Sequence, residues 1–177
     1  SAAKDVFSSN GYTRATTKEI ASAADVAEVT IFRRFDSKNN LYHETIMNYL
    51  VAPMLDYPRT LEKGKGKAEI ITLVEERINT LRVNKDLFIS AISEAHYNDE
   101  VKNIIQEIYT KVLEVLSLSI EYEQKGVNDI SVKKIAQTIL LTIVGGIIFE
   151  SLGADQEFND TNELLETIKS MIYRDQN

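Results

Sequence analysis

The sequence predicts an all-α protein in which an N-terminal helix-turn-helix module of three helices precedes a C-terminal helical bundle domain that dimerises. Apolar residues recur three and four positions apart along most of the chain, and no window alternates apolar and polar residues over the length of a strand. The 177 residues include only two prolines and seven glycines, so few positions interrupt a helix. We place the module in residues 1–46 and the bundle in residues 47–177.

The composition narrows the class of protein. Hydrophobic residues make up 44% of the chain and charged residues 27%, which is typical of soluble globular proteins. The chain contains no cysteine, which excludes disulfides and thiolate metal sites and favours a reducing cytoplasm. The longest nearly apolar run, residues 139–149, is far shorter than the roughly 20 residues that span a bilayer. We therefore expect a soluble, cytoplasmic protein with no membrane partner.

The charge is distributed unevenly along the chain. The first fifty residues contain six basic and six acidic side chains, so the whole net charge of −7 lies beyond them. This asymmetry permits an N-terminal region that binds DNA.

Four short helices are predicted in the first fifty residues. The first closes at Asn10-Gly11, and we expect its first turn to precede the sequence. Thr17 caps the second helix, which runs to Ala24, residues 28–35 form the third, and Ser37 caps the fourth.

The second and third of these helices have the build of a helix-turn-helix. Ile20, Ala21, Ile31 and Phe35 form their small core, Ala24 lies beneath the turn, and Val26 fills the corner. Asp25 takes the turn position that requires a left-handed backbone, which aspartate tolerates. The positions that face outward, and hence a major groove, are Glu28, Val29, Thr30, Phe32, Arg33 and Arg34. From spacing alone, a helical hairpin with a solvated basic end is an equal alternative.

Several runs agree in register with a known family. They are FSSNGY (7–12), ATTKEIA (15–21), ADV (24–26), TIFRRF (30–35), Ser37-Lys38 and Leu41. Together they resemble the TetR family of bacterial transcriptional regulators over about the first fifty residues. The resemblance implies a homodimer that binds a palindromic operator in double-stranded DNA, usually as a repressor, and that a small molecule in the C-terminal domain releases.

The resemblance also implies roles for individual residues. Phosphate contacts fall to Thr17, Thr30, Arg34 and Lys38, and Lys38 begins a helix, where backbone N–H groups add to an anion site. The positions that face base edges or adjacent phosphates are Lys18, Glu28, Val29 and Arg33. Glu28 has an equal alternative, which is to complement the positive end of its helix dipole.

Three residues depart from the family pattern. Asp25 replaces the usual turn glycine, and Ala27 the usual capping serine. Phe32 replaces the usual phosphate-contacting tyrosine, so that contact is lost or becomes an apolar contact with a sugar or a thymine methyl group.

No set of residues beyond the module has the pattern of an enzyme site, and we expect neither catalysis nor a cofactor. The two histidines, His43 and His96, lack the Glu-x-x-His spacing of a carboxylate-bridged metal bundle, because Glu94 and His96 are two positions apart. No serine elbow motif is present either.

Two apolar segments, residues 135–152 and 162–173, are expected to pair with their copies in a second subunit, as in the family that the chain resembles. The residues assigned to this interface are Ile143, Gly146, Ile147, Leu165, Ile168 and Ile172. The alternative is that both segments serve the core of their own subunit.

Aromatic residues recur among aliphatic ones between Leu73 and Tyr122, where we expect a small apolar or amphipathic effector. The residues assigned to its pocket are Phe88, Ile92, Tyr109, Leu113 and Tyr122. A plain core is the alternative for each of them. The resulting hypothesis is a sequence-specific DNA-binding regulator, a repressor that this ligand releases, and the alternative is a helical protein-interaction module without operator binding.

Overall fold

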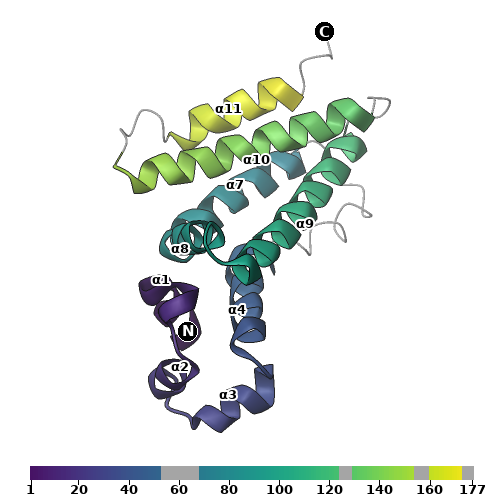
Figure 1. Ribbon diagram of the computed structural model, residues 1–177. Coiled ribbons are helices and arrows are strands. Elements are labelled where there is room, and N and C mark those ends of the chain that lie inside the picture. Colours follow the sequence, from purple (N-terminus) through teal and green to yellow (C-terminus); the bar gives the residue numbers. More distant parts are fainter. Residues whose placement is uncertain (53–67, 124–128, 154–159, 173–177) are drawn as a thin grey trace. The chain divides into compact units, whose positions relative to one another are not determined.

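The computed structural model describes residues 1–52, 68–123, 129–153 and 160–172, and every regular element in these ranges is a helix (Figure 1). The predicted all-α class is therefore confirmed. The chain divides into two compact units, with residues 1–52 and 84–109 in unit 1 and residues 53–83 and 110–177 in unit 2. The predicted boundary at residue 46 separates two functional domains, whereas the two units are defined by how compactly their residues pack. The functional boundary stays a prediction.

Unit 1 contains the N-terminal helices and two later segments. Its elements are α1 (Ala2–Arg14), α2 (Thr17–Ala23), α3 (Glu28–Phe35), α4 (Lys38–Ile46), the π-helical turn η1 (Met47–Val51), α8 (Lys85–Ala95) and the first part of α9 (Asp99–Glu123). The sequence predicted that α1 ends at Gly11, but the helix continues beyond this residue. Gly11 has a φ of 70° and kinks the chain, which then adds a last turn to Arg14.

The caps of α2 and α4 show where each helix begins. The side chain of Thr16, not Thr17, accepts a hydrogen bond from the Glu19 amide at 3.1 Å, and the Glu19 carboxylate accepts one from the Thr16 amide at 2.9 Å. This reciprocal capping box corrects the predicted cap by one residue. Ser37 caps α4 as predicted, since its hydroxyl accepts from the Asn40 amide at 3.1 Å.

The interior of unit 1 is built around three aromatic rings. The ring of Tyr42 meets Phe7 edge-on, with centroids 4.8 Å apart, and lies 5.0 Å from the ring of Tyr12. Burial raises the pKa of the Tyr42 hydroxyl, and burial together with a hydrogen bond to Glu100 raises the pKa of Tyr12. These rings join α1 to α4, while α8 packs along α1.

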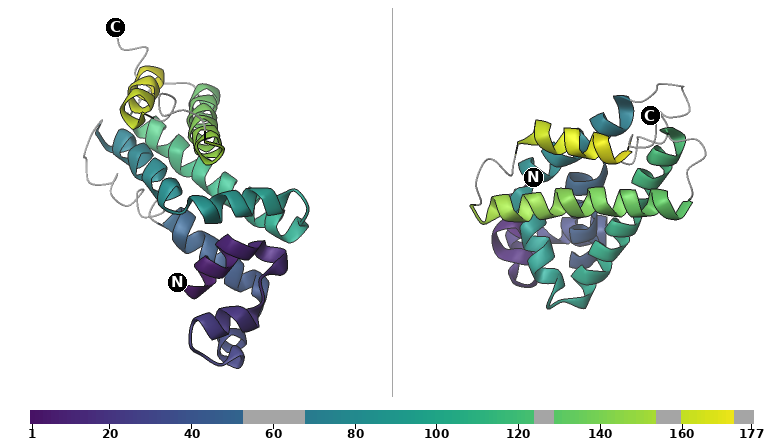
Figure 2. Two further views of the ribbon diagram at one scale, coloured as in Figure 1. Left: turned by 90° about the vertical axis from the view of Figure 1, so that its left-hand side faces the viewer. Right: turned by 90° about the horizontal axis from the view of Figure 1, so that it is seen from above.

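Unit 2 is a group of helices with an aliphatic interior. It contains α7 (Ala68–Val83), the second part of α9, α10 (Asp129–Ser151) and α11 (Thr161–Ile172). Helices α10 and α11 lie side by side, and α7 contacts both (Figures 1 and 2). Gly153, with a φ of 79°, follows the end of α10, where the sequence predicts a stop.

Helix α10 is more apolar than a partly exposed helix usually is. Residues Val132–Ser151 are long and apolar enough to cross a membrane, and 33% of that window is buried inside the protein. The buried residues, such as Ile139 and Ile143, face the interior of unit 2, whereas Leu141 is 65% exposed. The outer face of α10 therefore carries apolar side chains that the described residues leave exposed.

Candidate nucleic-acid interface

The turn between α2 and α3 fixes the angle of the helix-turn-helix. Asp25 has a φ of 53°, which confirms the left-handed conformation predicted for this position. Ile20, Ala21 and Ile31 are buried between the helices as predicted. The prediction for Val26 was wrong, since its side chain is 41% exposed.

Two further positions differ from the prediction for this core. Ala24 is exposed rather than enclosed beneath the turn, and Phe35 is only half-buried. The apolar core of the turn therefore consists of few side chains, and a hydrogen bond between Thr17 and Glu28 adds to it.

Helix α3 presents an exposed face that mixes apolar and basic side chains. Val29 is 70% exposed and Phe32 is 47% exposed, and Arg33 and Arg34 are exposed beside them. The Arg34 guanidinium lies 5.2 Å from the centre of the Phe35 ring, which keeps it near the end of the helix. Such a face offers cationic donors together with apolar surface, which suits the phosphates and methyl groups of a DNA groove.

Thr17 and Glu28 form a tie between α2 and α3. The Thr17 hydroxyl donates to the Glu28 carboxylate at 2.6 Å, and Thr17 is buried. Glu28 lies in the first turn of α3, where a carboxylate stabilises the positive end of the helix. This geometry favours the role in which Glu28 complements the positive end of its helix dipole over contact with a base. The same hydrogen bond directs the Thr17 hydroxyl toward a carboxylate rather than toward solvent.

Lys38 is held by the end of α1. Its ammonium donates to the carbonyl oxygens of Thr13, at 3.4 Å, and Ala15, at 3.0 Å, and lies 4.4 Å from the centre of the Tyr12 ring. An ammonium group has three donors, so one remains for a phosphate. Of the remaining predicted contacts, Lys18 is exposed and Thr30 is half-buried.

Helices α8 and α9 hold the C-terminal end of α1 through polar side chains. The Thr13 amide donates to Glu94 at 2.8 Å, the Tyr12 hydroxyl donates to Glu100, and the Ser90 hydroxyl donates to the Phe7 carbonyl at 3.2 Å. Gly11 lies directly against the Glu94 carboxylate, so a Cβ at this position meets it. Sequence reasoning missed these residues, because it considered Glu94 only as a metal ligand beside His96.

The N-terminal region matches one family model. The model described as bacterial regulatory proteins of the tetR family matches residues 1–45. The first 45 residues of this chain are therefore similar to the tetR family of bacterial regulatory proteins. No curated protein matches the chain.

Solved structures extend the likeness in fold to the whole chain. The transcriptional regulator FadR from Bacillus subtilis, in complex with stearoyl-CoA, is 21% identical with a TM-score of 0.71, covering 96% of this chain and 95% of that one. A putative TetR-family regulator from Syntrophomonas wolfei is 16% identical with a TM-score of 0.75, covering 97% and 91%. A putative regulator from Saccharomonospora viridis, in complex with choline, is 19% identical with a TM-score of 0.71, covering 98% and 93%.

The predicted interface residues lie mostly inside their own subunit. Ile143, Ile147, Leu165, Ile168 and Ile172 are buried in unit 2, and Gly146 is half-buried. Burial of this kind fits a role in the core of the subunit, and the assignment of these residues to a dimer interface stays a prediction. The outer face of α10 carries other apolar side chains instead.

The predicted pocket residues are distributed over both units. Phe88, Ile92 and Tyr109 belong to unit 1, whereas Leu113 and Tyr122 belong to unit 2. Phe88 and Leu113 are buried, Ile92 is half-buried, and the two tyrosines are exposed. The two histidines have neighbours within unit 1, since His43 pairs with Glu107 at 3.2 Å and the His96 ring lies against Tyr97.

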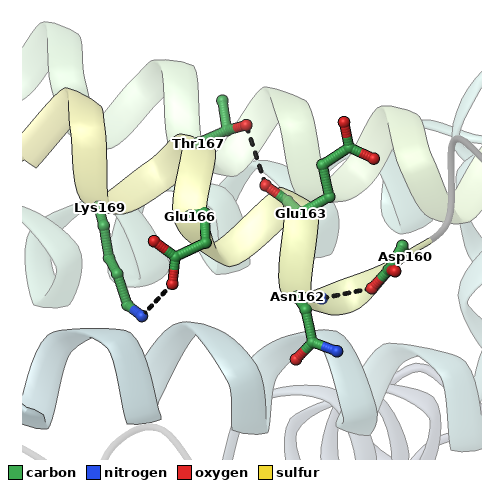
Figure 3. Close-up of polar contacts among 6 residues, drawn as sticks. All are labelled: Asp160, Asn162, Glu163, Glu166, Thr167 and Lys169. Carbon is green, nitrogen blue, oxygen red and sulfur yellow. Dashed lines mark hydrogen bonds and ion pairs between the residues drawn. The ribbon is translucent and has the colours of Figure 1, made fainter.

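Unit 2 holds a cavity of about 250 Å³ between α7, α10 and α11. The residues that line it are Ile78, Arg82, Thr142, Ile143, Gly146, Ile147, Asp160, Glu163, Leu164 and Thr167. Figure 3 shows that polar groups of α11 contact one another, as where Asp160 accepts from the Asn162 amide at 2.8 Å. The volume is below the roughly 300–1,000 Å³ of typical ligand pockets, so this cavity by itself indicates no effector site.

Proposed function

We propose that this protein is a TetR-family regulator, a cytoplasmic repressor that binds a palindromic operator in double-stranded DNA as a homodimer. The observation that carries the proposal is the outward face of α3, where Arg33 and Arg34 are exposed beside Val29 and Phe32. In a helix-turn-helix the second helix enters the major groove, and this face is the one that meets the bases.

The residues of the face have separate roles in this proposal. Arg33 reads a base edge, since a guanidinium binds the O6 and N7 atoms of guanine together. Arg34, Lys38, Lys18 and Thr30 contact phosphates, which sets affinity but carries little sequence information. Val29 and Phe32 provide apolar contact with thymine methyl groups or sugars. Thr17 and Glu28 hold the angle between the helices through their hydrogen bond.

The outer face of α10 supports a homodimer. Leu141 and Phe149 are exposed on this helix, and Leu152 is exposed directly after it. Apart from nearby residues of its own helix, a Cβ added to Gly145 meets no described atom within 4 Å. A second copy of α10 covers such a face and uses Gly145 for close approach. A two-fold dimer places two recognition helices about 34 Å apart, on one side of the duplex.

A small apolar or amphipathic effector fits the same framework. Two solved proteins of this fold contain ligands, stearoyl-CoA in one and choline in the other. Helix α9 has residues in both units, and its Glu100 holds Tyr12 of α1. A ligand that shifts α9 therefore moves the support of α1. Coupling of about 1–3 kcal/mol changes operator affinity roughly 5–150-fold.

Selection of bound fragments from random duplex DNA tests the DNA-binding part. The proposal predicts that the wild-type protein enriches a palindrome with half-sites one helical turn apart. Arg34→Ala should retain the same preferred sequence with lower recovery, whereas Lys102→Ala, an exposed residue on α9, should match the wild type. Failure to enrich any sequence contradicts operator binding.

A further inference from the structure

Arg77 is a buried cation for which the described part of the chain provides no partner. It is 7% exposed, and among the residues whose burial the structure describes it is the one charged side chain that is buried. Its Nε is buried and makes no hydrogen bond, and no ion pair joins it to any described residue. The acidic side chains nearest in sequence, Glu75 and Glu76, are exposed on α7.

Arg82, on the same helix, is an arginine whose guanidinium has partners within the chain. Its Nε donates to the Glu150 carboxylate at 2.9 Å, and a second nitrogen donates to the Thr161 hydroxyl. Arg82 lines the cavity with Ile78, whereas Arg77 lies on a face of α7 about 100° from Ile78. The fold therefore provides a carboxylate for the less buried arginine and none for the more buried one.

Burial of an unpaired guanidinium is costly, and titration does not remove the charge. Burial lowers the pKa of Arg77 to about 10. The group therefore remains protonated at neutral pH, by a factor of about 1,000. A buried charge needs an opposite charge and hydrogen-bond acceptors, and a fork of N–H donors matches a carboxylate in shape.

We propose that Arg77 binds the carboxylate of an effector whose remaining part is apolar. The proposal names the chemical class of the effector, and it rests on the effector control proposed above. Around Arg77 the same face of α7 carries Ile70, Val74 and Leu81, all fully buried. Because the neighbours of Arg77 on this face of α7 are aliphatic, an effector with an apolar body and a charge at one end suits these surroundings.

Binding to the wild-type protein provides the first test. The probes are octanoate, dodecanoate and hexadecanoate, each paired with the primary alcohol of the same chain length, and dodecyltrimethylammonium serves as the cationic control. The proposal predicts that at least one carboxylate binds about 10-fold or more tightly than its alcohol, as expected of a charge-assisted pair, and that the cation binds worst. Dodecyl phosphate serves as a further arm, and tighter binding of the phosphate than of dodecanoate contradicts the choice of carboxylate.

The apo-protein provides a second test that does not depend on the probe. Arg77→Met replaces an unpaired charge with an apolar side chain of similar length, so the Tm should rise by about 3–10 °C. Arg82→Met, the matched control, removes a paired charge and should lower the Tm. Arg77→Met should also abolish the preference for carboxylate over alcohol, while Arg77→Lys keeps the sign of that preference with lower affinity.

The proposal requires both results, and either failure overturns it. Equal binding of every carboxylate and its alcohol by the wild type contradicts an anionic effector. A lower Tm for Arg77→Met, or a variant that does not fold, shows that Arg77 already has a partner within the chain. If carboxylates bind through Arg77 but leave operator affinity unchanged, this inference stands and the proposed release by effector fails instead.

Discussion

In unit 1 α1 is held by polar side chains from α8 and α9, whereas in unit 2 the helices pack mainly through aliphatic side chains, with Arg82 bonding Glu150 and Thr161. Glu94, Glu100 and Ser90 each accept from or donate to a group on α1. In unit 2 Arg77 has no such partner among the described residues, and Leu141 and Phe149 lie exposed on α10. Unit 1 thus holds α1 by contacts within the chain, while unit 2 has two features for which we propose a partner molecule, the buried Arg77 and the exposed face of α10.

The largest effect is expected from a charge placed inside unit 2. Ile168 is fully buried, so Ile168→Asp should destabilise the protein by about 4 kcal/mol or more and unfold much of it at ambient temperature. Thermal melting followed by circular dichroism measures this. Near wild-type stability for this variant contradicts the placement of Ile168 in the core.

The same substitution on the outer face of α10 should act on assembly instead. Leu141→Asp should leave the Tm within a few degrees of the wild type but shift sedimentation from dimer to monomer, because only the interface loses an apolar contact. Leu118→Asp, on α9, is the matched exposed control and should remain dimeric. A dimeric Leu141→Asp variant, or a monomeric wild type, places the interface elsewhere or removes it.

The polar hold on α1 predicts a smaller loss of stability. In Gly11→Ala the alanine must adopt a positive φ, and its Cβ displaces the Glu94 carboxylate. The variant should therefore lose about 2–3 kcal/mol in free energy of unfolding, measured by denaturant titration. Gly153 also has a positive φ, but apart from its chain neighbours a Cβ at this position meets no described atom within 4 Å. Gly153→Ala should therefore lose only about 1 kcal/mol in free energy of unfolding. Equal losses mean that the contact with α8 contributes nothing.

The loss of a single base contact should change the free energy of DNA binding by an amount similar to, or smaller than, the loss of stability in Gly11→Ala. Arg33→Ala should relax the preference at one base position per half-site, at a cost of roughly 1–3 kcal/mol, without changing the preference elsewhere. Competition binding with single-base variants of the selected operator measures it. If the preference at every position is unchanged, Arg33 does not read a base.

The smallest expected effect concerns the corrected helix cap. Thr16→Ala should cost about 1 kcal/mol of stability, because the Glu19 amide loses its acceptor. Thr167→Ala removes a hydroxyl that only returns to its own helix, and should change stability by less than about 0.5 kcal/mol. If the two variants lose equal stability, the capping box does not stabilise α2.

Local patterns made the N-terminal region predictable. Asp25 in the turn, the bounds of α3 and the Ser37 cap are each determined by a few neighbouring residues, and the structure agrees. The cap of α2 was misplaced because two threonines are adjacent, and only the geometry shows that Thr16 pairs with Glu19 while Thr17 reaches Glu28.

Contacts distant in sequence were not predictable in the same way. Nothing in the pattern around Glu94 or Glu100 pairs them with α1, from which they are separated by more than 80 residues. Periodicity identified α10 and α11 as apolar, but it did not separate Ile143, which faces the core, from Leu141, which faces out. An arginine at position 77 looks like any helix-surface residue until its burial is known.

The salt dependence of DNA binding tests the central claim most directly. With a duplex that carries the selected operator, the logarithm of the affinity should fall steeply and linearly with the logarithm of salt concentration, by about 0.9 units for each phosphate contact. Arg34→Ala should reduce this slope by about two units, one for each protomer, and Lys102→Ala should leave it unchanged. A wild-type affinity that does not change with salt, or a slope that is the same in Arg34→Ala, contradicts an operator-binding role for the α3 face.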